Sequence, residues 1–95
     1  MPRINDAISI SRDSALIRWS HAAHKSVELS YTIALNNTIE KSIDELNSTF
    51  AVIGGLEPDR SYTVNLTAFV TYDGMQFKIG QDEAELQMLP GGIAM

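Results

Sequence analysis

The chain has 95 residues, of which 44% are hydrophobic and 20% charged, and its formal net charge is −5. This length fits one domain, and the balance of 7 basic against 12 acidic residues disfavours nucleic acid and anionic membrane surfaces as partners, because phosphate groups are bound by clustered Lys and Arg. Without cysteine, and without an apolar run long enough to cross a bilayer, the domain depends on the packing of its core for stability.

Apolar residues recur with a period of two along most of the chain, which predicts β-strands. In chain order, the expected strands cover residues 4–10, 15–19, 27–35, 38–43, 48–53, 62–70 and 83–89. Residues 43–46 hint at a helical turn, which we interpret as a loop. About seven short strands separated by turn residues predict an all-β fold, a seven-stranded antiparallel β-sandwich.

The C-terminal residues have the composition of a linker. Pro90 ends the last expected strand, and Gly91-Gly92 loosens the chain after it. We therefore expect the domain to cover residues 1–90 and a linker to cover residues 91–95. Nothing at the N-terminus is typical of a signal peptide, so we expect the chain to be an excerpt of a longer protein.

One stretch resembles the loop that leads into strand F of a fibronectin type III domain, namely Leu56-Glu57-Pro58-Asp59-Arg60-Ser61-Tyr62. The resemblance implies that Leu56 fills the core and that Pro58 shapes the turn. It also implies that Tyr62 buries its ring while its hydroxyl bonds to nearby backbone, because a buried phenol needs a hydrogen-bond partner.

Two aromatic residues extend the resemblance over Pro2 to Pro90. Trp19 and Tyr31 stand where the family places the tryptophan of strand B and the tyrosine of strand C. An immunoglobulin domain is disfavoured, because there is no Cys pair and Trp19 precedes the strand of Tyr31. The resemblance implies an immunoglobulin-like sandwich of fibronectin type III topology, with a structural core that includes Trp19, Tyr31, Leu56, Pro58 and Tyr62.

The strand at residues 48–53 can adopt two registers. The spacing in the family places Ala51 and Ile53 inward and leaves Phe50 and Val52 outward. The opposite register would bury more apolar surface if Gly54-Gly55 formed a bulge. We favour the first register.

Three asparagines lie in N-x-[ST] sequons and are candidate glycosylation sites: Asn36, Asn47 and Asn65. Three sequons favour a secreted or cell-surface parent protein, although Ser and Thr are also common in β-domains. Asn65 is expected to point outward, because its neighbours Val64 and Leu66 point inward. A glycan on Asn65 would cover the sheet face that contains residues 27–35, 62–70 and 83–89.

The segment between residues 70 and 83 is apolar for a loop and contains the turn-forming pair Asp73-Gly74. By resemblance, the loop between strands F and G often carries adhesion or receptor contacts. Candidate protein contacts are therefore Tyr72, Asp73, Met75 and Phe77. The segment has no Arg-Gly-Asp triplet, so the resemblance does not support an integrin partner.

A packing role is the interpretation that we favour for this segment. In it, the two strands extend as a long hairpin, and Tyr72, Met75, Phe77 and Ile79 cap the end of the core. A strand cannot run unbroken from Met75 to Leu89, so this interpretation requires a bulge at Gly80.

Catalysis and cofactor binding have no support in the sequence. His21 and His24 have HxxH spacing, but a zinc site usually needs three or four ligands, so we interpret them as part of a solvated loop. Asp82, Glu83 and Glu85 are interpreted as a solvated edge. We predict no enzymatic activity, no cofactor and no metal.

The sequence favours a non-catalytic module that acts as a spacer and protein-interaction surface in an extracellular receptor or adhesion protein. We expect it to contact other protein domains, to insert into no membrane and to be monomeric in isolation. Two alternatives remain open, an accessory module of a secreted or surface enzyme or of a phage or bacterial protein, and an intracellular structural module.

Overall fold

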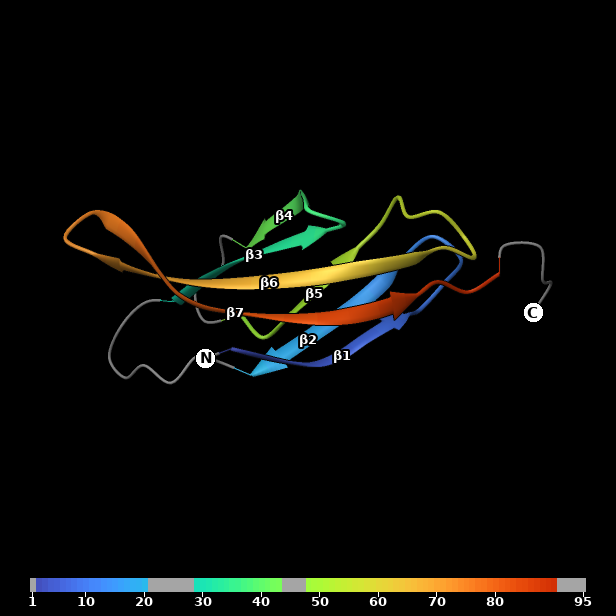
Figure 1. Cartoon of the computed structure of the whole chain (residues 1–95), viewed down its shortest axis with the longest axis horizontal. Helices are drawn as coiled ribbons and strands as arrows, with labels where there is room; N and C mark the ends of the chain where they lie inside the picture. The colour runs from blue at the N-terminus through green and yellow to red at the C-terminus, as the bar shows by residue number, and fades with distance from the viewer. Residues whose placement is uncertain (1, 21–28, 44–47, 91–95) are drawn as a thin grey trace.

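A computed structural model describes residues 2–20, 29–43 and 48–90, and these residues form two antiparallel sheets (Figure 1). The three-stranded sheet has the order β1-β2-β5, with β1 at Arg3–Ser9, β2 at Ala15–Ser20 and β5 at Phe50–Ile53. The four-stranded sheet has the order β4-β3-β6-β7, with β3 at Leu29–Leu35, β4 at Thr38–Ile43, β6 at Ser61–Tyr72 and β7 at Met75–Gln87.

The predicted all-β sandwich is confirmed, with seven strands among the described residues. The expected loop at residues 43–46 falls largely on residues 44–47, and the expected linker covers residues 91–95. Both of these segments lie outside the described residues.

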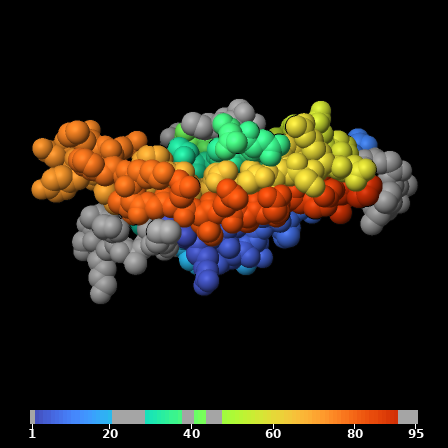
Figure 2. Space-filling view, in the orientation of Figure 1, coloured from blue at the N-terminus to red at the C-terminus, as the bar shows by residue number. Residues whose placement is uncertain are grey.

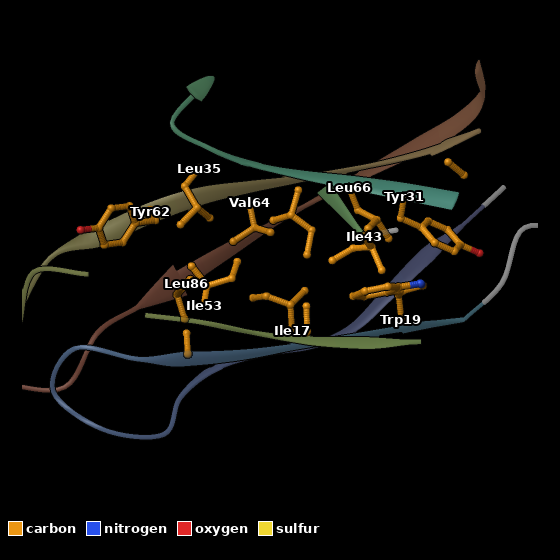
Figure 3. Packing of buried hydrophobic residues seen from close by; sticks show 14 of the residues in the cluster. Ile17, Trp19, Tyr31, Leu35, Ile43, Ile53, Tyr62, Val64, Leu66 and Leu86 are labelled. Carbon is orange, nitrogen blue, oxygen red and sulfur yellow. The ribbon is translucent and has the colours of Figure 1, made fainter. Parts of the chain in front are cut away.

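The core lies between the two sheets and follows from the alternation in the sequence. In β3 every second side chain from Leu29 to Leu35 is buried, and in β6 the same holds from Tyr62 to Val70. The three-stranded sheet contributes Ala15, Ile17 and Trp19 from β2 to the same cluster (Figure 3). Burial of these inner faces is the main favourable term for a domain that has no disulfide.

Two aromatic rings join the sheets at one end of the core. The ring centroids of Trp19 in β2 and Tyr31 in β3 lie 5.2 Å apart, with their planes inclined at 55° (Figure 3). This tilted arrangement brings the edge of one ring toward the face of the other, which is favourable for aromatic quadrupoles. Both residues are almost fully buried.

A tyrosine corner closes the opposite end of the core. The Tyr62 hydroxyl accepts a hydrogen bond from the Glu57 backbone N–H at 3.0 Å, and Leu56 is buried beside it. This is the arrangement that the family resemblance implies. Pro58 is exposed, so its place in the predicted structural core is corrected to a turn position. Asp59 follows it with a φ of 60°, and a positive φ after proline is typical of a type II turn, in which the proline side chain lies on the surface.

The favoured register of residues 48–53 is confirmed. Ala51 and Ile53 in β5 are buried, whereas Phe50 and Val52 are exposed. The pairing of Ala51 with Ile17 and of Ile53 with Ala15 in β2 fixes this register, because opposed residues share one face of a sheet.

Two hydrogen bonds that involve a side chain join β1 to β7 and to the residues just after it, across the open side of the sandwich. The Ile4 N–H donates to Asp82 Oδ2 at 2.7 Å, and the Leu89 N–H donates to Ser9 Oγ at 3.1 Å. Asp82 therefore points toward β1 and is half-buried, in contrast to the solvated role predicted for it. Its position satisfies a backbone donor of an edge strand.

We expect Trp19→Ala to lower the free energy of unfolding by about 3–5 kcal/mol, because it removes a buried aromatic ring from the contact between the sheets. Urea unfolding followed by circular dichroism measures the change. Phe50→Ala is the matched control, since this exposed aromatic ring should contribute less than about 1 kcal/mol. Equal losses from the two substitutions would contradict the described packing.

Candidate protein-contact surface

β6 and β7 form a hairpin that is longer than the strands predicted from the sequence. They pair continuously from Ser61 with Gln87 to Tyr72 with Met75. The connecting residues, Asp73 and Gly74, have φ values of 52° and 77°. Two central residues with positive φ define a type I′ turn, whose twist matches that of the strands that it joins. The Asp73-Gly74 pair thus keeps the ladder intact up to its last residues.

The bulge predicted at Gly80 is present. Gly80 pairs with Ala68 and Lys78 pairs with Phe69, so Ile79 is the extra residue of β7. An extra residue reverses the alternation of a strand, because side chains point to opposite faces with a period of two. It allows one strand to pass from the sandwich into the protruding end of the hairpin.

The tip of the hairpin does not cap the core, contrary to the packing role favoured from the sequence. Tyr72, Met75 and Phe77 are 72%, 60% and 45% exposed. Only Ile79 packs against the buried cluster. Among the described residues, β3 pairs with β6 as far as Leu29 with Val70, and the hairpin extends beyond that pair (Figure 1). Residues 27 and 28 of the predicted strand lie outside the described residues.

The three exposed apolar residues lie on one face of the hairpin. Phe77 is opposite Val70, which is buried, and Met75 is opposite Tyr72 two positions further along the same face. The other face carries Thr71, Gln76 and Lys78. We call Tyr72, Met75 and Phe77 the hairpin face; it continues the inner face of the four-stranded sheet beyond the sandwich. Asp73 lies beside it in the turn.

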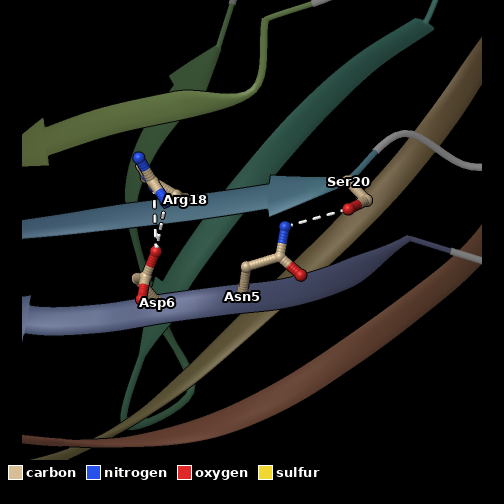
Figure 4. Close-up of polar contacts among 4 residues, drawn as sticks. All are labelled: Asn5, Asp6, Arg18 and Ser20. Carbon is tan, nitrogen blue, oxygen red and sulfur yellow. Dashed lines mark hydrogen bonds and ion pairs between the residues drawn. The ribbon is translucent and has the colours of Figure 1, made fainter.

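A second apolar surface lies on the outer face of the three-stranded sheet. Ile8, Leu16 and Val52 stand opposite one another on three adjacent strands, and Ile8 and Val52 are exposed. Beside this row, Arg18 forms an ion pair with Asp6 at 2.8 Å, and Asn5 donates to Ser20 Oγ (Figure 4). The spacing of residues predicts that Val52 and Phe50 point outward, but their place beside β1 follows only from the pairing of strands that are distant in the chain.

The sequons lie in different local environments. Asn36 is exposed in the turn between β3 and β4, where Asn36 and Asn37 have φ values of 51° and 69°. The Asn36 Oδ1 accepts a hydrogen bond from the Thr63 N–H at 2.9 Å. Asn65 lies in β6 on the outer face of its sheet and is half-buried, with Glu83 opposite. Asn47 lies outside the described residues.

A polar hollow lies beside the tyrosine corner, lined by Asn36, Glu57, Arg60 and Tyr62 among other residues. Arg60 Nη1 lies 2.6 Å from Glu57 Oε2, and its guanidinium lies 5.1 Å from the centre of the Tyr62 ring. The hydrogen bond and charge of Glu57 raise the pKa of Arg60 above its ordinary value. This cation is already paired within the chain, so the hollow presents no free charge to an anionic ligand.

Metal-binding and membrane-spanning features are not found in the part of the chain that the structure describes. No group of three or more His, Cys, Asp or Glu residues is arranged to hold a metal ion there. No helix in that part is long and apolar enough to span a membrane. His21 and His24 lie outside it.

Comparison with known proteins identifies the family. The family model of the fibronectin type III domain matches residues 2–78, which is most of the chain. The chain belongs to the fibronectin type III family. The match includes Trp19, Tyr31 and the tyrosine corner, together with β1 to β6 and the first residues of β7.

A solved structure gives an independent comparison of the fold. It comes from a study of the computer-based redesign of a β-sandwich protein, and it is 16% identical to this fibronectin type III domain. The match covers 100% of this chain and 98% of the other, with a TM-score of 0.60. This similarity supports the sandwich fold alone. The search of curated proteins found no match.

We expect Gly74→Ala to lower the free energy of unfolding by about 1 kcal/mol, because an L-residue is strained at the positive φ of the turn. A Cβ at this position would meet no atom within 4 Å, so the cost is that of the backbone alone. Gly54→Ala is the matched control, where the added Cβ would lie 3.8 Å from Ser14 Oγ, an ordinary contact. Urea unfolding measures both. An unchanged stability of Gly74→Ala would contradict the type I′ turn.

Proposed function

We propose that this fibronectin type III domain is a non-catalytic spacer and protein-interaction module of an extracellular receptor or adhesion protein, and that it contacts another protein through the hairpin face. The observation that supports this function is the exposure of Tyr72, Met75 and Phe77 on one face of a hairpin that extends beyond the sandwich. Aromatic residues and methionine are enriched where proteins bind one another, and exposed apolar clusters often mark such sites.

The rigidity of the hairpin supports the same role. The ladder between β6 and β7 continues to Tyr72 and Met75, and a two-residue turn closes it. The backbone that carries these side chains is therefore already held by hydrogen bonds before a partner binds. Less conformational entropy is lost on binding than from a loose loop, which favours affinity.

The sequons support an extracellular location for the parent protein. Asn36 is exposed in a turn, and Asn65 lies on the outer face of its sheet. Neither residue belongs to the hairpin face. Glycans at these positions would leave Tyr72, Met75 and Phe77 available to a partner.

We expect Asn65 to carry a glycan when the protein is made in a secretory eukaryotic host, because it lies in a sequon on an outward face. Mass spectrometry of the intact protein and of its peptides measures the modification, and Asn65→Gln should remove the corresponding mass. An unmodified Asn65 in fully secreted protein would remove this support for an extracellular parent.

We expect a photocrosslinking amino acid at position 72 to capture a protein partner at the surface of the source cells more strongly than the same group at position 71. Thr71 is the matched control because it is an exposed neighbour on the other face of the hairpin. The double variant Tyr72→Ser, Phe77→Ser should weaken binding of the captured protein at least about tenfold, as loss of two aromatic contacts does.

The same double variant should keep the free energy of unfolding within about 1 kcal/mol of the parent value, because both side chains are exposed. Urea unfolding measures this. Equal crosslinking from positions 71 and 72, or binding that survives the double variant, would contradict the proposed contact surface.

A further inference from the structure

Among the described strands, the outer edge of β7 is unpaired, with β1 of the other sheet beside its sandwich half. β7 is the last strand in the order β4-β3-β6-β7, and none of the described strands pairs with its outer side. At 13 residues it is also longer than a typical strand. Figure 2 shows it crossing the molecule from the protruding hairpin, in orange, to its red C-terminal end. An edge of this kind offers unpaired backbone groups to another strand.

The hydrogen bonds of Thr63 show which residues of β7 present these groups. Its N–H donates to Asn36 Oδ1 and its C=O accepts from the Asn36 N–H, so both point away from β7. In an antiparallel pair, opposed residues bond to each other or both point away from each other. Glu85, opposite Thr63, therefore directs its N–H and C=O to the free edge.

The same alternation continues to the hairpin tip. Glu83 and Gln81 follow Glu85 at intervals of two and face the edge in the same way. The bulge at Ile79 shifts the pattern by one residue, so that Lys78 and Gln76 are the next to present free backbone groups. These five residues also share the outer face of the sheet, because their partners in β6 do.

The charges along this edge are unequally distributed. The hairpin half, residues 75–79, contains Lys78 and no acidic residue. The half in the sandwich contains Asp82, Glu83 and Glu85 and no basic residue. Asp82 is directed inward to the Ile4 N–H, which leaves Glu83 and Glu85 as the charges of the outer face.

We propose that the free edge of β7 binds the same edge of a second copy of this chain, antiparallel and related by a two-fold axis, with Lys78 opposite Glu83 of the second copy. In this register Gln76 stands opposite Glu85 of the second copy, and the edge-facing backbone groups of Gln76, Lys78, Glu83 and Glu85 meet. Gln81, beside the two-fold axis, stands opposite Gly80, whose backbone groups face β6, so the pairing is interrupted at the bulges. The symmetry produces each pair twice. Each protruding hairpin is then paired along the sandwich half of the other copy.

The bulge is what makes this register consistent. Residues opposed in it have numbers that sum to 161, an odd number, so an unbroken alternation would place their side chains on opposite faces. Because Ile79 reverses the alternation, Lys78 and Glu83 share the outer face, and Phe77 meets Ala84 on the inner face.

Charge disfavours the registers that are centred on an acidic residue. A pairing centred on Glu83 or Asp82 would place carboxylates of the two copies opposite one another, which is unfavourable across a strand pair. The proposed pairing also gives Phe77 and Met75 apolar neighbours, Ala84 and Leu86 of the second copy. The net charge of −5 opposes association at long range, so the dilute chain is monomeric and the dimer forms at high concentration.

This inference goes beyond the proposed function, because it concerns the backbone edge of β7, although Met75 and Phe77 of the hairpin face lie beside that edge. Sedimentation equilibrium of the 95-residue chain, at chain concentrations up to about 1 mM, measures the dissociation constant of the dimer. We expect Lys78→Glu and Glu83→Lys each to raise the dissociation constant of the dimer about tenfold, because both symmetric pairs become like-charged. The double variant Lys78→Glu, Glu83→Lys should restore it.

Arg12→Glu is the matched control for Lys78→Glu, since it makes the same charge change at an exposed loop residue and should leave the dissociation constant within about twofold. Concentration-dependent amide shifts in NMR spectra should be largest at residues 76–85. A chain that remains monomeric up to about 1 mM would overturn the proposal. So would a dimer whose shifts map to the outer face of β1, β2 and β5, or a double variant that does not recover. Loss of crosslinking at position 72 would concern the hairpin face alone.

Discussion

The contact between two sheet faces determines everything else in this domain, because no disulfide supplements it. Trp19 and Tyr31 close one end of the contact, and Tyr62 with Leu56 closes the other. Between them, side chains from alternate positions of four strands exclude water. The Tyr62 hydroxyl enters this space with a partner, the Glu57 N–H, whereas the buried Trp19 Nε1 has none among the described residues.

The hairpin shows what happens where one sheet ends and the other continues. The inner face of β6 is apolar along its length, but the described pairing of β3 with β6 ends at Val70, before Tyr72. The remaining apolar face meets solvent, and the edge beside it has no neighbouring strand among the described residues. The uncovered face follows from that difference in strand length, and the unpaired edge follows from the place of β7 at the end of its sheet.

The sequence predicts most of the fold because alternation and the tyrosine corner are local signals. The family resemblance places Ala51 and Ile53 inward, and β2 holds them there. The position of Tyr72, Met75 and Phe77 could not be predicted in this way. Their exposure depends on where β3 stops pairing with β6, and that is a contact between residues some forty positions apart in the chain. Two adjacent asparagines are a local signal for a tight turn, and Asn36 and Asn37 both have a positive φ. In the sequence, Asn36 is interpreted only as part of a sequon.

The hydrogen bonds that join β1 to β7 and to Leu89 determine how the domain would carry tension in the proposed role of a spacer. The two strands run in the same direction, with Ile4 bonded to Asp82 near one end and Ser9 bonded to Leu89 near the other (Figure 1). A force that pulls Arg3 and Pro90 apart is directed along both strands. It loads the two bonds and the core beneath them simultaneously, in shear, instead of opening one bond after another. Mechanical resistance is therefore concentrated where the first and last strands of the domain lie side by side.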